Sequence, residues 1–173
     1  MREQSGILYS RTDKVRRVLW AAVRPLFCWS PRPLYGWRRF LLRVFGAQVG
    51  RGVRIYPSVR IFAPWNLEIG DYVTIGWCVR IYCLAKVSIE ERSTVSQYAH
   101  LCAGSHDFRK PGMPFDNRPI RIGKNCWICA DAFVGNGVKV GDNSVVGARA
   151  VIVRDVPKDV VVVGNPGRIV GKR

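Results

Sequence analysis

The stretch IGKNCWICADAFVGNGVKVGDNSVVGARAVI, residues 122–152, places an aliphatic residue at every sixth position. The six hits are Ile122, Ile128, Val134, Val140, Val146 and Ile152, and glycine directly follows four of them. A period of six matches neither an α-helix, at about 3.6, nor a simple strand, at about 2. It is the period of a parallel β-helix whose flat faces span about six residues, each with one aliphatic side chain directed inward.

The same period continues toward the N-terminus, in registers that shift along the chain. The earlier runs are Val49, Ile55, Ile61 and Leu67, then Ile69, Ile75, Ile81 and Val87, and then Ile89, Val95 and Leu101. With three faces per coil, one turn takes about 18 residues, so residues 49–153 predict about five to six coils of a mainly β fold. We expect the glycines that follow inward residues to form tight corners with positive φ.

Residues 102–119 interrupt the hexads. They contain Gly104, Ser105, His106 and Asp107, with two phenylalanines and three prolines, and they do not fit the six-residue period. Glycine and proline at this density are typical of irregular structure, and long loops inside compact domains are usually functional. The sequence therefore predicts a loop extruded at about 102–119 from one corner.

The first third of the chain carries most of the charge and has a different periodicity. Residues 1–60 hold 13 basic and 2 acidic side chains, which is +11 of the formal charge of +16. One helix, capped by Thr12 and Asp13, has the apolar stripe Val15, Val18, Leu19, Ala22 and Leu26. A second helix runs from near Pro33 to Gly46 with Leu34, Trp37, Phe40, Leu41, Val44 and Phe45. We expect a basic amphipathic helical cap over 1–48 and the β-helix with its C-terminal tail over 49–173.

Two roles stay open for these helices. The first is a cap that seals the open first coil, as solenoids require. The second is docking to an anionic membrane surface, suggested by Trp20, Trp29 and Trp37 among many basic residues. We do not expect nucleic-acid binding, because the chain shows no known binding motif and no aromatic platform on its strands.

Composition limits the class and the compartment of the protein. Apolar residues make up 48% of the 173 residues, enough for a buried core. No apolar run reaches the roughly 18 to 20 residues of a transmembrane helix, and the N-terminus does not resemble a signal peptide. We expect a cytoplasmic protein, with peripheral contact at the inner face of the membrane as an option. The six cysteines predict reduced thiols, and the single CxxC pair, Cys126 and Cys129, predicts no metal site.

Several segments resemble the hexapeptide-repeat acyltransferases, most closely the colanic-acid-type polysaccharide O-acetyltransferases. They are RPLYGWRRFLLR at 32–43, VRIYPSVRI at 53–61, APWNLEIGD at 63–71, GSHD at 104–107 and VGNPGR at 163–168. The resemblance implies a left-handed β-helix, a homotrimer with sites between subunits, and acetyl-CoA as the acyl donor. It implies transfer of the acetyl group to a sugar hydroxyl of a surface polysaccharide or its lipid-linked precursor.

His106 is the candidate general base, because deprotonating an alcohol as it attacks a thioester needs a group with a near-neutral pKa. Asp107 beside it is the second candidate catalytic residue, to orient the histidine, bind the acceptor or cap the loop. His100, within the hexads, is more consistent with a wall or subunit-interface position. Direct transfer is the simpler mechanism, and a covalent route through Cys102 is the alternative.

The resemblance also assigns residues to the coenzyme. It places Ala130 and Ala148 along the pantetheine arm, Trp127 near the mouth of the site, and Arg154 and Arg168 near the phosphates, where guanidinium groups bind well.

The chain departs from the family at several positions, with Cys129 where glycine is usual, Val153-Arg154 where Thr-Lys is usual, and Gly167 where alanine is usual. Loss of the threonine hydroxyl puts one cofactor hydrogen bond in doubt. The alternative function is a catalytically inactive scaffold or binding protein, against which the intact His106 argues.

Overall fold

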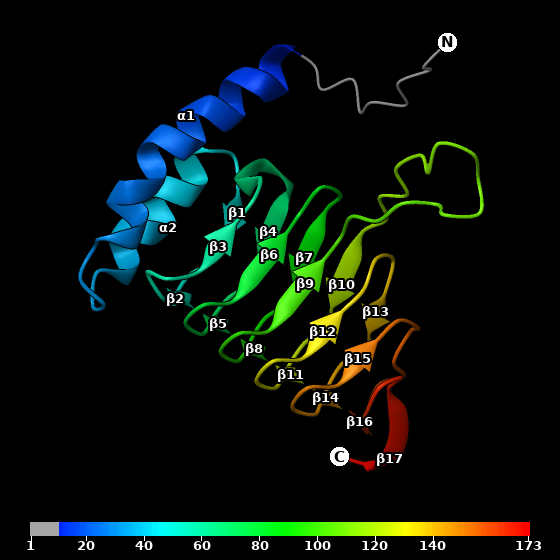
Figure 1. Cartoon of the computed structure of the whole chain (residues 1–173). Coiled ribbons are helices and arrows are strands. Elements are labelled where there is room, and N and C mark those ends of the chain that lie inside the picture. The colour runs from blue at the N-terminus through cyan, green and yellow to red at the C-terminus, as the bar shows by residue number, and fades with distance from the viewer. Residues whose placement is uncertain (1–10) are drawn as a thin grey trace.

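The computed structural model describes residues 11–173 as two helices followed by a triangular stack of short strands (Figure 1). Helix α1 (Arg11–Cys28) and helix α2 (Tyr35–Val44) lie across one end of the stack. The strands form the three faces of a left-handed parallel β-helix, which confirms the fold predicted from the hexads.

Each face is one sheet that takes a strand from every coil. Sheet A contains β1 (Gln48–Val49), β4 (Leu67–Ile69), β7 (Val87–Ile89), β10 (Ile120–Ile122) and β13 (Lys139–Val140). Sheet B contains β2 (Arg54–Ile55), β5 (Thr74–Ile75), β8 (Thr94–Val95), β11 (Trp127–Ile128), β14 (Val145–Val146), β16 (Val160–Val163) and β17 (Arg168–Lys172). Sheet C contains β3 (Arg60–Ile61), β6 (Arg80–Tyr82), β9 (His100–Cys102), β12 (Phe133–Val134) and β15 (Val151–Ile152). Only the last pairing, between β16 and β17, is antiparallel among the pairings of these strands.

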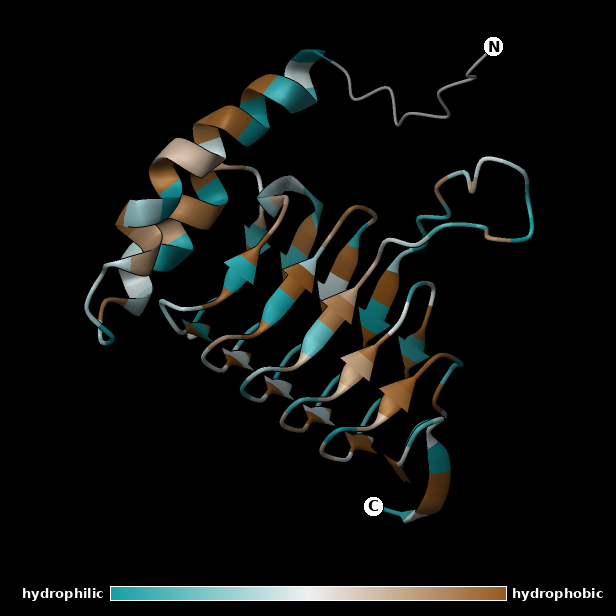
Figure 2. Cartoon of the chain, in the orientation of Figure 1, coloured by the Kyte–Doolittle hydropathy of each residue, from teal (hydrophilic) through white to brown (hydrophobic). Residues whose placement is uncertain are grey.

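The hexad residues form the core. All the aliphatic residues that recur at every sixth position in the four series are buried. Along each coil, hydrophobic residues alternate with more hydrophilic ones (Figure 2). Inward aliphatic side chains of successive coils therefore stack in columns, because parallel pairing aligns equivalent positions such as Ile55 with Ile75 and Ile75 with Val95. Apolar burial along these columns stabilises the stack.

The early coils are longer than the predicted 18 residues. Leu67 pairs with Val87, an advance of 20, whereas Arg121 pairs with Lys139, an advance of 18. The corner between sheets C and A holds the extra residues, and in the first coil it forms a 3-10 turn, η1 (Pro64–Asn66). The shifts of hexad register along the sequence mark this longer corner, which is also the corner where the loop at 102–119 leaves the coil.

The glycines after inward residues do not serve the purpose that we expected. Gly123 and Gly141 have no positive φ, and the left-handed positions lie farther into the corners, at residues such as Asn125 and Asn143. A Cβ on Gly123 would instead lie 2.3 Å from Asp142 Oδ1, and one on Gly141 would lie 2.5 Å from the backbone nitrogen of Lys158. These glycines allow the close approach of the next coil.

Helix α2 and the middle of α1 close the first coil through its backbone carbonyls. Each coil donates N–H groups to the next, as Arg54 N does to Val73 O at 2.9 Å, so the first coil's own carbonyls face the helices with no strand beyond them. Side chains take the place of that strand. The pairs are Arg43 with Val49 O, Arg39 with Val53 O, Arg38 with Ile55 O and Trp20 with Ile61 O, at 2.6 to 2.9 Å.

Arg38 is the centre of this closure. It is fully buried, and its guanidinium also donates to Ser30 Oγ at 2.7 Å and to Pro31 O at 2.9 Å. Burial lowers the pKa of Arg38 from its usual value. Part of the basic character of the first third therefore has a structural cause, since buried arginines can satisfy several carbonyls at once.

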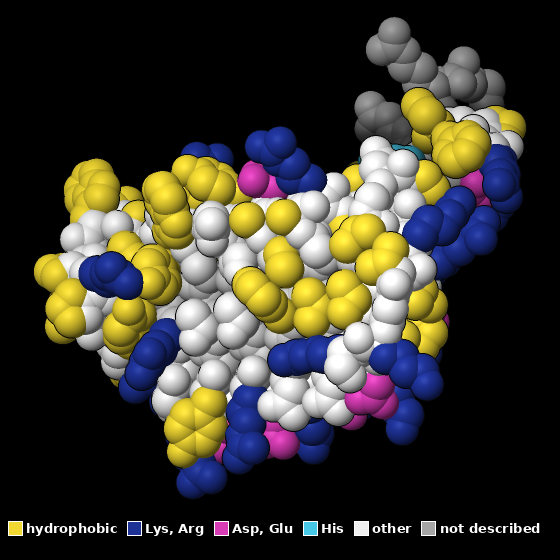
Figure 3. Space-filling model, turned by 90° about the horizontal axis from the view of Figure 1, so that it is seen from below, with side chains coloured by type: hydrophobic (Ala, Val, Ile, Leu, Met, Phe, Trp, Pro, Cys, Tyr) yellow, Lys and Arg dark blue, Asp and Glu magenta, His cyan; other side chains and the backbone are white. Residues whose placement is uncertain are grey.

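The apolar stripes of the two helices mostly face away from the β-helix. The buried side chains are instead Trp20 and Phe27 of α1 and Leu41 and Leu42 of α2. The exposed stripe residues are Val15, Val18, Leu19, Ala22 and Leu26 of α1 and Trp37, Phe40 and Val44 of α2, with Leu34 just before it. Hydrophobic side chains accordingly gather at the helical end of the molecule (Figure 3). Both helices carry apolar residues on more than one face, and the bulky Trp20 and Phe27 of α1 pack inward while Trp37 and Phe40 of α2 stay exposed.

Candidate active site

The loop between β9 and β10 projects from the wall of the β-helix, as the broken hexads predict (Figure 1). Its two limbs pair through the backbone, because Asp107 N donates to Pro114 O at 2.9 Å and Asp116 N donates to Ser105 O at 2.8 Å. Asn136 of the next coil fixes the base of the loop by donating from Nδ2 to Asp116 O at 2.7 Å. Hydrogen bonds between its two limbs and one from the next coil therefore stabilise this loop.

His106 lies on this loop with its ring exposed. Its Nδ1 is 2.7 Å from the backbone carbonyl oxygen of Met113, and its ring lies against Phe115 with centroids 4.4 Å apart. A carbonyl oxygen only accepts hydrogen bonds, so Nδ1 carries the proton in the neutral imidazole and the lone pair is on Nε2. The ring is therefore oriented in the tautomer that a general base at Nε2 requires.

The carboxylate of Asp107 does not contact the ring of His106, as a carboxylate that orients a histidine would. Its Oδ1 accepts from Arg109 N at 3.2 Å, and its Oδ2 lies 3.4 Å from Lys110 Nζ. The carboxylate therefore caps the turn that follows His106, while Met113 O is the partner of His106 Nδ1. Of the three roles considered for Asp107, capping the loop is the one that these contacts match.

His100 lies on β9 in the wall of sheet C. Its ring is half-buried and makes a T-shaped contact with Phe133 at a centroid distance of 5.4 Å, and burial together with the positive charge of Arg80 lowers its pKa. Arg60, Arg80 and His100 occupy equivalent positions of successive coils and, with Arg24, line a groove of about 460 Å³. The groove was not anticipated, although the spacing of 20 residues between these basic side chains is visible in the sequence.

The six cysteines are free thiols, with Cys28 at the end of α1 and the other five in the β-helix. Cys102 lines the same groove and donates to Gly104 O at 3.3 Å. Burial raises the pKa of Cys83 to about 11, and burial also raises the pKa of Cys126 and Cys129. Within residues 11–173, no group of three or more His, Cys, Asp or Glu side chains is close enough to hold a metal ion.

Trp127, Ala130 and Ala148 lie on the later coils. Trp127 is exposed on β11, and its Nε1 donates to Ser96 Oγ at 2.9 Å. Ala130 and Ala148 occupy the same corner of consecutive coils, where Arg149 N donates to Ala130 O at 2.9 Å. Small side chains at a stacked corner leave room beside the wall for an extended ligand.

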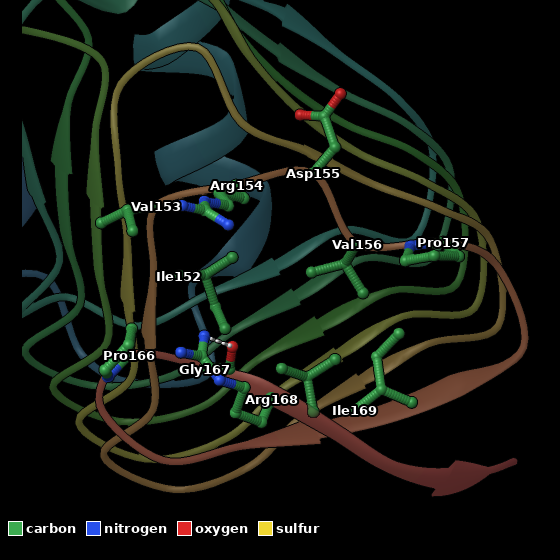
Figure 4. A pocket seen from close by; sticks show the side chains of 11 residues that line it. Ile152, Val153, Arg154, Asp155, Val156, Pro157, Pro166, Gly167, Arg168 and Ile169 are labelled. Carbon is green, nitrogen blue, oxygen red and sulfur yellow. Dashed lines mark hydrogen bonds between the residues drawn. The ribbon is translucent and has the colours of Figure 1, made fainter.

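Arg154 and Arg168 meet at a pocket of about 360 Å³ at the C-terminal end (Figure 4). Val153, Gly167 and Pro166, which follows a cis peptide bond, also line it. Both arginines are exposed, and Arg168 Nη1 makes a long contact of 3.4 Å with Gly167 O. Two guanidinium groups around one hollow form a site that suits phosphate groups.

The structure brings some of the candidate residues together and keeps others apart. It joins Arg154 with Arg168 and stacks Ala130 with Ala148, while His106 stands on the projecting loop of an earlier coil. The contribution of Met113 was missed, because its backbone carbonyl has no signature in the sequence.

Comparison with known proteins gives one family match and several similar relatives. Residues 119–154 match the model described as "Bacterial transferase hexapeptide (six repeats)". The chain is 45% identical over 154 residues to the putative colanic acid biosynthesis acetyltransferase WcaF of Escherichia coli K12, covering 89% of this chain and 85% of that protein. It is 30% identical over 137 residues to the galactoside O-acetyltransferase of the same organism, covering 77% and 67%.

Solved structures of similar fold include two complexes with the coenzyme. A galactoside acetyltransferase in complex with coenzyme A superposes with a TM-score of 0.87 at 24% identity, covering 95% of this chain and 84% of that chain. A hexapeptide-repeat acetyltransferase from Vibrio cholerae, complexed with acetyl coenzyme A, gives 0.83 at 24% identity, covering 94% and 90%.

Proposed function

Because this chain belongs to the hexapeptide-repeat acetyltransferases, we propose that it transfers the acetyl group of acetyl-CoA to a hydroxyl of a sugar. The acceptor in this proposal is a surface polysaccharide or its lipid-linked precursor. The names of the relatives support this class, since one belongs to colanic acid biosynthesis and another acetylates galactosides.

The hydrogen bond between His106 Nδ1 and Met113 O is the observation that carries the mechanism. His106 Nε2 removes the proton of the acceptor hydroxyl as its oxygen attacks the thioester carbonyl carbon. The carbon–sulfur bond then breaks, the acetyl group stays on the sugar oxygen as an ester, and the proton passes from Nε2 to the departing thiolate. The products are the acetylated sugar and coenzyme A, and no covalent enzyme intermediate is needed.

The later coils offer places for the parts of the coenzyme. In this proposal the pantetheine arm lies along the corner of Ala130 and Ala148, near Trp127, and the phosphates bind Arg154 and Arg168. These residues fit the ligand because small side chains leave space along the wall and the two exposed guanidinium groups supply positive charge at its end.

We also propose that the enzyme is a homotrimer with its active sites between subunits. The loop of His106, after β9, projects from its own β-helix (Figure 1), and the C-terminal pocket lies at β15 to β17, farther along the same chain. A neighbouring copy is a simple way to complete a site that needs both. A mass of one chain at micromolar concentration would contradict this arrangement.

The test of the function is turnover of acetyl-CoA, followed as thiol release, with free sugars, nucleotide sugars and lipid-linked glycans as acceptors. We expect release that depends on one acceptor class, with the acetyl ester found on the sugar by mass spectrometry. Absence of release with every acceptor would favour the inactive scaffold.

A further inference from the structure

The outward side of the two helices is an apolar surface that nothing else within residues 11–173 covers. Nine large side chains that define this outer face are exposed: Val15, Val18, Leu19, Leu26, Trp29, Leu34, Trp37, Phe40 and Val44. Trp29 is 84% exposed and Val18 is 69% exposed, whereas Trp37, at 39%, is the least exposed of the nine. Trp37 Nε1 donates to Leu26 O at 3.1 Å, which joins the two helices across this face.

Closure of the β-helix does not account for the outer face. The inward side chains Trp20, Phe27, Leu41 and Leu42 already cover the core, and the carbonyls of the first coil have their side-chain donors. A cap of a solenoid needs a polar outer surface to stay in solution. An apolar patch of this extent marks an interaction surface.

The charge around the outer face indicates what covers it. Residues 11–43 contain eight arginines and one lysine against a single acid, Asp13. Arg38, Arg39 and Arg43 are bonded to carbonyls of the first coil. Five further cations are exposed: Arg16 lies over Trp65, Arg32 over Tyr56, and Arg24 lines the groove of sheet C, while Arg11 and Lys14 make no such contact with the β-helix among residues 11–173. Figure 3 shows Lys and Arg side chains beside the hydrophobic ones at this end of the molecule.

Two copies of this face would bring like charges together, whereas an anionic surface would neutralise them. A helix pair with Trp, Phe and Leu on one side and Arg and Lys beside it is the pattern of interfacial helices that lie in the plane of a membrane. No helix within residues 11–173 is long and apolar enough to cross a membrane. The pattern thus fits peripheral binding.

We propose that the outer face of α1 and α2 docks on a bilayer that contains anionic lipid. The apolar side chains enter the interface between headgroups and acyl chains, and the exposed cations contact the phosphates. The β-helix then stands on the membrane with its helical end down. Docking would bring the enzyme to a lipid-linked acceptor, and this part of the inference rests on the proposed function. Membrane binding itself can be measured without turnover.

The test is co-sedimentation of the full-length protein with vesicles of phosphatidylcholine that contain about one quarter phosphatidylglycerol, compared with phosphatidylcholine alone. The variants are Val18→Glu and Phe40→Glu, one on each helix. The matched control is Val170→Glu on β17, which has the same chemistry and a similar exposure, 61% against 69% for Val18, at the other end of the β-helix.

We expect the wild type to bind the anionic vesicles, with binding that weakens but persists in part as salt rises, because apolar contact is not screened. Val18→Glu and Phe40→Glu should each lower the partition coefficient about tenfold, and Val170→Glu should change it less than about twofold. Equal loss for the three variants, or no binding of the wild type at low salt, would overturn the proposal.

A second copy as the occupant predicts a different result. Val18→Glu would then lower the mass of the assembly in light scattering and leave vesicle binding as in the wild type. Thiol release with a water-soluble acceptor separates this test from the proposed chemistry, because Val18→Glu should keep that activity whether or not it binds vesicles.

Discussion

Arg38 Nε lies 2.6 Å from the carbonyl oxygen of Ile55, and this contact replaces the strand that the first coil lacks. Three further carbonyls of the same coil accept from Arg39, Arg43 and Trp20. The edge of a sheet is normally a risk for aggregation, because its unpaired backbone groups can pair with another chain. Here arginine side chains occupy that edge.

Replacing Arg38 with Met should therefore destabilise the protein. The substitution keeps an aliphatic stem but leaves the buried Ile55 O without this donor, and a buried unsatisfied carbonyl costs about 1–3 kcal/mol. The midpoint of urea unfolding measures the effect. Arg24→Met is the control and should stay close to the wild type, because Arg24 is exposed on α1 and its side chain makes no hydrogen bond within residues 11–173. Similar midpoints for both variants would argue against the carbonyl closure.

Gly123→Ala tests the spacing between coils. The added Cβ would lie 2.3 Å from Asp142 Oδ1 and 2.9 Å from the backbone nitrogen of Asp142, so the next coil has to move. We expect a loss of stability of about 1–3 kcal/mol, the usual cost of overpacking. Gly171→Ala is the matched control, because a Cβ there meets nothing within 4 Å. Thermal unfolding of the two variants should differ clearly, and equal melting temperatures would remove the close-approach argument.

His106→Ala should lower kcat by about 10²- to 10⁴-fold, the range for a positioned general base. A folded variant that keeps the full rate would rule out His106 as the base. His100→Gln is the comparison and should retain most of the rate, since His100 lies in the wall of sheet C. Acetyl label recovered on Cys102 would instead favour the covalent route.

Arg168→Ala should raise KM for acetyl-CoA about five- to tenfold, because a guanidinium–phosphate contact is among the stronger charge-assisted hydrogen bonds. If Arg168 holds the 3′-phosphate, KM for the dephospho analogue should change much less. Equal changes for the two donors would remove Arg168 from that phosphate. Measuring KM of Arg154→Ala for acetyl-CoA and for its dephospho analogue then shows which arginine contacts which phosphate.

Stability should depend on pH through His100. Burial and Arg80 lower the pKa of His100 below its usual 6.5, so the unfolded state takes up its proton first as the pH falls. The contribution is therefore complete above about pH 6.5 and is lost as the pH falls through the lower pKa of the folded state. Urea unfolding at several pH values should show a smaller decline for His100→Gln than for the wild type. An identical decline would mean that other groups cause it.

The sequence predicts the β-helix well because the aliphatic residue that recurs at every sixth position is always inward and buried. The loop at 102–119 is also predictable, since it breaks a long regular pattern. The packing face of α1 was harder to predict, because Trp20 and Phe27 lie on one side of the helix and Val18 and Leu26 on another. Either side satisfies the helical period, and only the shape of the first coil selects between them.

The site is predictable to a smaller extent. His106 stands out as a histidine in a loop, whereas its partner is a main-chain oxygen, which any residue in place of Met113 would supply. The contacts of Asp107 could not be derived either, because three roles are compatible with its position and only the folded loop distinguishes them.

The direction of the hydrogen bonds between coils has a consequence for how such a chain can lengthen. The carbonyl end accepts guanidinium groups, and the other end finishes with the antiparallel strand β17 against β16, so the two ends are not interchangeable. A duplicated coil inserted between them would present the same donors and acceptors to both neighbours. Evolution can therefore add turns in the interior of this protein, while its first and last segments have to be inherited as fixed ends.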